Sequence, residues 1–145
     1  MIIDNTLVFS DKQAITATAN STNVIDLTAP GIPAGSLVAL RRDIGDNACD
    51  TPIAVTVVEA FNNLTSLKIT LQVATDAAFT TPVEVASRTY LLAELTLGAN
   101  LSFPAEFPMG TNLEFVRISY TVTGTAPTTG KIFAAVVAGR QSNRG

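Results

Sequence analysis

The segment RRDIGDNACD, residues 41–50, gathers the side chains with the most obvious chemistry. Its charged residues are Arg41, Arg42, Asp43, Asp46 and Asp50. Calcium accepts carboxylate oxygens as ligands, but the spacing here lacks the alternating pattern and the closing glutamate of an EF-hand. Arginines beside acids also suit ion pairs with another subunit, and Gly45 and Asn47 suit a polar loop between two strands. The segment alone leaves a structural loop, a partner interface and a calcium site open.

The remaining residue types argue against most enzymes. The chain has no histidine, which removes Ser-His and Cys-His catalysis and zinc sites built on imidazole. GIPAGS, residues 31–36, lacks the Lys-Ser/Thr ending of a phosphate-binding loop. A carboxylate pair could serve a glycosidase, but spacing brings no two glutamates together, and solvated surface acids are the commoner case. These glutamates are Glu59, Glu84, Glu94, Glu106 and Glu114. We therefore expect no enzyme activity and no cofactor.

Low charge and high apolar content favour a protein with a partner. Of the 145 residues, 14% are charged and 47% are hydrophobic, and the net charge is -3. An isolated monomer would have unusually little surface charge, so we expect a partner protein to cover part of it. Apart from Arg41 and Arg42 the basic residues are scattered, so nucleic acid is not an expected partner. No apolar run approaches the roughly 20 residues of a membrane span, so a membrane is not expected either.

The amino terminus and the cysteine content predict synthesis in a reducing cytoplasm. MIIDNTLVFSDK has no basic region ahead of an apolar run, so no signal peptide is expected. The single cysteine, Cys49, cannot form an intrachain disulfide.

Alternation of apolar and polar residues predicts strands. LKITLQV, residues 67–73, and EFVRISYTV, residues 114–122, each place one apolar face inward, with Tyr120 among the inward residues. Phe115 breaks the second pattern because it falls on the polar face. KIFAAVVAG, residues 131–139, is apolar on both faces, which is typical of a strand covered on each side. This strand is expected near residues 132–138, and six others are expected near residues 6–9, 15–19, 24–27, 36–41, 53–59 and 83–88.

About nine short strands separated by turn residues predict an all-β fold. We expect one antiparallel β-sandwich domain spanning residues 1–145, of the jelly-roll type or, alternatively, immunoglobulin-like. TVTGTAPTTG, residues 121–130, is typical of a hairpin turn, and YLLAELTLG, residues 90–98, suits either a short helix or an irregular strand. Residues 1 to about 10 suit either an arm that reaches a neighbour or the first strand, and residues 140–145 a short tail.

Apolar residues of the amino terminus, the charged segment and three phenylalanines are the candidate contacts with a partner. Two of these phenylalanines flank the loop FPAEFP, and the third is the ring on the polar face of its strand. The candidates are Ile2, Ile3, Leu7, Arg41, Arg42, Asp43, Asp46, Phe103, Phe107 and Phe115.

Three blocks of the chain resemble the small capsid cement, or decoration, proteins of tailed bacteriophages. The blocks are MIIDNTLVFSDKQAITATANSTNVIDLTAPG, VTVVEAFNNLTSLKITLQVATDAAF and SYTVTGTAPTTGKIFAAVVAGRQ. Their order and spacing carry the similarity, whereas the segments at 41–50 and 103–110 do not match. The resemblance implies a jelly-roll protein on the outer capsid surface of the virion, bound to the major capsid protein. It also implies a homo-oligomer, with a trimer favoured over a dimer.

A second hypothesis is a receptor-binding or carbohydrate-binding β-sandwich of a phage tail or fibre. Such proteins usually present aromatic platforms, and this chain has no tryptophan and two tyrosines. The scarcity of these residues favours the capsid hypothesis.

Overall fold

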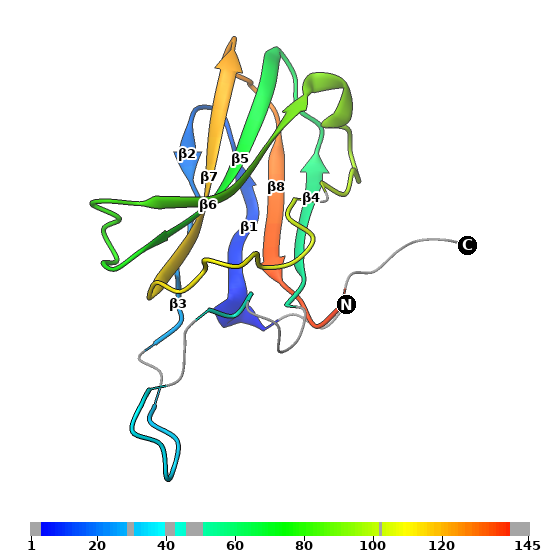
Figure 1. Ribbon diagram of the computed structural model, residues 1–145. Coiled ribbons are helices and arrows are strands. Elements are labelled where there is room, and N and C mark those ends of the chain that lie inside the picture. The colour runs from blue at the N-terminus through cyan, green and yellow to red at the C-terminus, as the bar shows by residue number, and fades with distance from the viewer. Residues whose placement is uncertain (1–3, 29–30, 40–42, 46–50, 102, 140–145) are drawn as a thin grey trace.

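The computed structural model describes residues 4–28, 31–39, 43–45, 51–101 and 103–139. Within them the chain forms eight strands and two short 3-10 helices (Figure 1). The elements are η1 Asn5–Leu7, β1 Val8–Ala14, β2 Ala19–Asn20, β3 Ile25–Asp26, β4 Ile53–Glu59, β5 Leu64–Ala74, β6 Val83–Leu91, η2 Leu92–Glu94, β7 Phe115–Gly124 and β8 Lys131–Val136. The strands form two antiparallel sheets that face each other, which confirms the predicted all-β sandwich. The jelly-roll and immunoglobulin-like alternatives stay predictions.

The two sheets divide the strands unequally. One sheet has the order β1-β8-β4, and the other has the order β2-β7-β5-β6, with β3 also paired to β7. Consecutive strands β7 and β8 lie in different sheets, so the prediction of a hairpin turn at residues 121–130 was wrong. The physical reason is that β7 is already paired on both sides, by β5 and by β2 and β3, and β8 is paired by β1 and β4.

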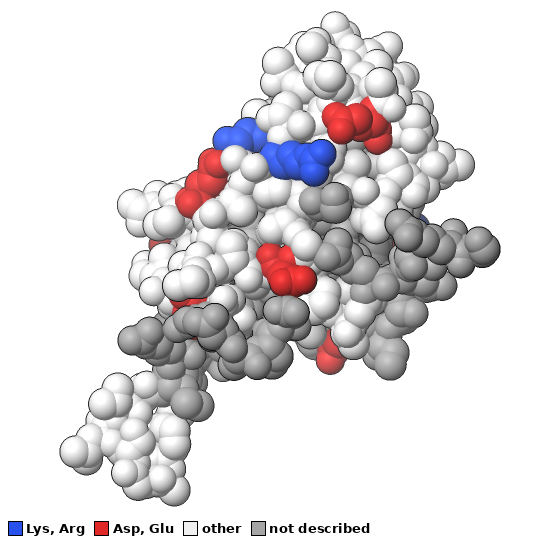
Figure 2. All heavy atoms as spheres, turned by 45° about the vertical axis from the view of Figure 1, so that its right-hand side comes forward, with Lys and Arg blue, Asp and Glu red and all other residues white. Residues whose placement is uncertain are grey.

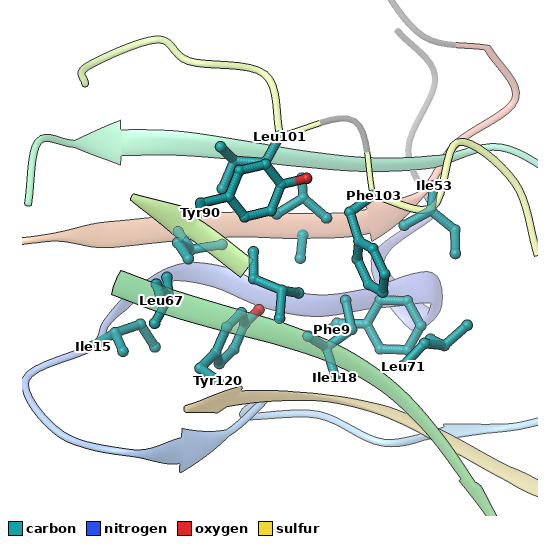
Figure 3. Packing of buried hydrophobic residues seen from close by; sticks show 14 of the residues in the cluster. Phe9, Ile15, Ile53, Leu67, Leu71, Tyr90, Leu101, Phe103, Ile118 and Tyr120 are labelled. Carbon is teal, nitrogen blue, oxygen red and sulfur yellow. The ribbon is translucent and has the colours of Figure 1, made fainter. Parts of the chain in front are cut away.

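The alternating strands supply the inner faces of the sandwich. Leu67, Ile69, Leu71 and Val73 of β5 are fully buried, and Tyr120 of β7 is buried beside them (Figure 3). Side chains from β1, β4 and β8 of the other sheet belong to the same cluster. The predicted registers of β5 and β7 are therefore confirmed, because only these registers put every apolar residue of the pattern inside.

Strand β8 is apolar on both of its faces, as its sequence predicts. On the inner face Ile132 and Ala134 join the main core. On the outer face Ala135 belongs to a second buried cluster, which also contains Val8, Ala54 and Val137, the residue directly after the strand. In addition, β8 is the central strand of its sheet, because it pairs with β1 on one side and with β4 on the other.

The shorter strand predictions were less accurate. The strand expected at residues 6–9 begins at Val8, after the 3-10 helix η1, and only Ala19 of the stretch 15–19 is in a strand. The strand expected at 24–27 is reduced to β3, Ile25–Asp26. Residues 36–39, the described part of another expected strand, are exposed and not extended in a sheet. Among the described residues no strand pairs with them, and their side chains lie outside both core clusters. The stretch 90–98 ends β6 and then forms η2.

A buried hydrogen-bond network joins the two sheets. The hydroxyl groups of Ser10 in β1 and Tyr120 in β7 are 2.8 Å apart, and the Ser10 hydroxyl donates to Oε1 of Gln13 at 2.7 Å. Because that bond uses the single Ser10 proton, the Tyr120 hydroxyl is the donor between them. Burial raises the pKa of Tyr120 above its ordinary value, so its donor proton is retained at neutral pH.

Replacing Ser10 with alanine should lower the free energy of unfolding by about 1–3 kcal/mol, because the Tyr120 hydroxyl would be left buried without its acceptor. Tyr120→Phe should cost less than Ser10→Ala, since Ser10 keeps its bond to Gln13. The double variant should be destabilised by less than the sum of the two single changes. Urea unfolding of the four proteins measures this coupling, and strictly additive losses would contradict the network.

Candidate interaction surface

Several elements meet at one end of the sandwich, which we call the loop end. It consists of η1, β3, the start of β7, the segment 107–113 and a projecting loop of residues 31–39 (Figure 1). Asp26 of β3 pairs with Phe115 of β7, and the N–H of Leu27 donates to the carbonyl oxygen of Glu114 at 2.8 Å. These bonds hold the end of β3 against the start of β7, a few residues before the projecting loop begins.

The projecting loop carries the two most exposed large apolar side chains of the described chain, Leu37 and Val38. All residues from 31 to 39 are exposed, and Leu37 is 100% exposed, Val38 73% and Ile32 65%. The loop has no charged residue, and Figure 2 shows it as an uncharged lobe that stands apart from the body at lower left. Exposed apolar groups that gather on one feature, rather than being scattered singly, are typical of interaction sites.

Local hydrogen bonds give this loop a defined shape. The N–H of Ser36 donates to the carbonyl oxygen of Pro33 at 3.0 Å, which closes a turn. The hydroxyl of Ser36 donates to the carbonyl oxygen of Val38 at 3.0 Å. Gly35 has φ of +82°, a conformation that glycine adopts without strain. The turn therefore presents Leu37 and Val38 beside one another.

Asp43 has a structural role in the loop that follows. Its Oδ1 accepts the N–H of Gly45 at 3.2 Å, and its Oδ2 accepts the N–H of Gly110 at 2.9 Å. Gly45 packs so closely on the backbone of Pro108 that any Cβ there would overlap it. For residues 43–45 the structure thus supports the polar-loop interpretation, with Asp43 bound to two backbone N–H groups of its own chain. A contact of Asp43 with a partner stays a prediction.

Five other predicted contacts lie outside the described residues. They are Ile2, Ile3, Arg41, Arg42 and Asp46. Within the described ranges no group of three or more possible metal-ligating residues is found. The calcium and ion-pair hypotheses for residues 41–50 stay predictions.

Phe103 and Phe107 are core residues, which corrects their assignment to a partner contact. Each is only 5% exposed and belongs to the main core cluster. The reason is that their segment runs along the edge of β4: the N–H of Ile53 donates to the carbonyl oxygen of Ala105 at 3.0 Å, and the N–H of Phe107 to that of Thr51 at 3.1 Å. The segment covers the open edge of the smaller sheet, and its two rings turn inward.

Leu7 and Phe115 are half-buried at the loop end. Leu7 packs against the main core, and Phe115 lies on β7 between Ala74 of β5 and Asp26 of β3. Both keep part of their surface available to a partner. Val8 and Phe9 are buried in β1, so for these two residues the first-strand interpretation is right and the arm interpretation wrong.

Three of the five glutamates form surface ion pairs with a neighbouring lysine or arginine. Glu59 pairs with Lys131, Glu84 with Lys68, and Glu94 with Arg88. A hydrogen bond from Ser87 and the contact with Lys68 lower the pKa of Glu84 from its ordinary value. Such pairs are what solvated strand surfaces usually carry, and each contributes little to stability.

Sequence reasoning missed the projecting loop as a site. The run GIPAGSLVA, residues 31–39, was compared only with a phosphate-binding loop and with a strand. The signal that could have identified it is the combination of turn residues, large apolar side chains and no charge across nine positions. Because residues 36–41 were expected to form a strand, residues 31–39 were not recognised as a single apolar loop.

The described chain is therefore an antiparallel β-sandwich with an exposed, uncharged apolar loop projecting from one end. A match to the Bbp16 family covers residues 9–137, and the chain belongs to this phage-related family. No curated protein matches the chain. None of the helices in the described ranges is long and apolar enough to cross a membrane.

Proposed function

We propose that this protein is a capsid cement protein, which binds the outer surface of an assembled bacteriophage shell and stabilises it. The observation that carries the proposal is the uncharged apolar loop of residues 31–39, which projects from a β-sandwich that belongs to a phage-related family. The resemblance of three sequence blocks to decoration proteins agrees with it. The partner is the major capsid protein, and the protein acts as a homo-oligomer, with a trimer favoured over a dimer.

The mechanism is mass action on the assembled lattice. Copies that bind the lattice but not its dissociated subunits stabilise it by their binding free energy. The protein needs no chemical step for this role. It needs only a surface that matches a feature present when capsid subunits lie side by side.

The size of the projecting loop explains why the protein would act as an oligomer. Burying Ile32, Leu37 and Val38 is worth roughly 5–9 kcal/mol in total, at about 1.5–3 kcal/mol for each side chain. Association itself costs about 4–15 kcal/mol of lost translational and rotational freedom, so a single loop binds weakly. Two or three loops held in one oligomer raise the effective concentration after the first contact and give tight binding.

Co-sedimentation with shells assembled from the major capsid protein of the same phage tests the proposal. We expect saturable binding and a raised temperature of shell disruption on heating. Immature and expanded shells are compared, with shells alone as the control. Absence of binding to both forms would refute the cement function and direct the search to tail or fibre assembly or to a soluble glycan.

A further inference from the structure

The projecting loop of residues 31–39 has the shape and chemistry of an insertion element. It is convex and stands away from the sandwich (Figures 1 and 2). Its three large apolar side chains are mostly or fully exposed, and it contains no charge. Turn hydrogen bonds through Ser36 hold its conformation in the free protein, so little conformational entropy is lost when it binds.

We propose that this loop docks as a preformed knob into an uncharged apolar recess on the capsid lattice, an inference that rests on the proposed cement function. In a dimer the recess must belong to a different protein, because copies paired about a twofold axis present the same patch to each other, and two convex knobs touch only at their tips. Such a contact falls far short of the roughly 1,000 Å² that a stable interface buries, whereas a recess encloses a knob on all sides. In a trimer the knob would meet a different patch of the next copy, and the oligomeric state of the loop variant below tests that case.

The ionic alternative predicts the opposite response to salt. An interface made by Arg41 and Arg42 would weaken as salt rises, because exposed charges are screened. Docking of an uncharged apolar loop does not depend on such pairs. Binding should therefore change less than about threefold between 0.05 M and 0.5 M sodium chloride, a range in which screening grows severalfold.

A pair of matched double variants tests the assignment on shells to which the wild-type protein binds. Leu37→Ser with Val38→Ser removes two exposed apolar side chains from the loop. Leu91→Ser with Leu97→Ser is the control, since these residues are 59% and 71% exposed and lie beside η2, away from the loop. The loop variant should bind shells about 100-fold more weakly or worse. The control should bind as the wild type does, and Leu37→Met with Val38→Ile should keep binding within about fivefold.

Each outcome decides the proposal. Thermal melting of all variants should match the wild type, since the replaced side chains are exposed. If the wild-type protein binds and the loop variant binds equally well, the knob is refuted while the cement function stands. If raising the salt concentration releases the wild-type protein from the shells, the knob proposal fails and the ionic interface of Arg41 and Arg42 is favoured. If the loop variant loses its oligomeric state in sedimentation velocity, the recess lies on a second copy of this chain and the proposal fails. If the wild type does not bind shells, both proposals fail.

Discussion

Replacing Phe9 with alanine is expected to lower the free energy of unfolding by about 3–5 kcal/mol, the usual cost of removing a buried aromatic ring. Phe9 is fully buried in the main core, on the strand that pairs with β8. A single domain is typically stable by about 5–15 kcal/mol, so the loss is a large fraction of the total. The melting temperature, measured by circular dichroism, should fall by about 10 °C or more.

Leu37→Ala is the control for this change. Leu37 is 100% exposed, so its truncation should alter stability by less than about 0.5 kcal/mol. The two variants separate structure from binding: Phe9→Ala should unfold early, whereas Leu37→Ala should melt like the wild type and bind shells more weakly. If Phe9→Ala melted normally and only lost shell binding, residue 9 would belong to an arm and the position of β1 would be wrong.

The strands with one buried face could be predicted from the sequence, and the reason is register. In β5 and β7 a shift by one residue would expose every apolar side chain of the pattern, as Leu67, Ile69 and Ile118 show. The same reasoning predicted that Tyr120 points inward and that both faces of β8 are covered. Where one face of a strand is buried and the other exposed, the local alternation of apolar and polar residues is enough to predict its orientation.

Assignments that depend on distant pairing could not be predicted. Residues 121–130 have the composition of a hairpin turn, but whether two strands pair depends on which neighbours already occupy their edges. Phe103 and Phe107 flank prolines, as exposed loop residues often do, yet their segment covers the edge of β4 and buries both rings. Asp43 bonds to Gly110, 67 positions away, and no local pattern records that contact.

The candidate site was predicted only in part for the same reason. Leu7 and Phe115 lie half-buried at the loop end, and nothing local in the sequence separates them from core residues. Their contact with a partner stays a prediction. Leu37 and the β-branched Val38 lie in an apolar run, a pattern that favours a strand. Within the described part of the chain no strand pairs with this run, and neither side chain belongs to a core cluster.

The link between β7 and β8 supplies a second large expected effect. Gly130→Ala should lower the free energy of unfolding by about 3 kcal/mol or more. Gly130 has φ of +135°, a conformation that costs other residues about 1–3 kcal/mol. An added Cβ would also overlap the ring of Phe61, and overpacking of this kind costs about 1–3 kcal/mol. Thermal and urea unfolding measure the loss.

Two further glycines separate the causes of this loss. Gly98 has φ of +79° but open space around it, so Gly98→Ala should cost only the backbone strain, roughly 1–2 kcal/mol. Gly139 has neither constraint, so Gly139→Ala should be neutral or slightly stabilising. Equal losses at Gly130 and Gly98 would mean that the Phe61 ring moves aside. The ordering Gly130, Gly98, Gly139 would instead show that the ring is fixed where the chain crosses between the sheets. That crossing would then be a rigid feature of the body, at the start of the strand β8 on which the smaller sheet is built.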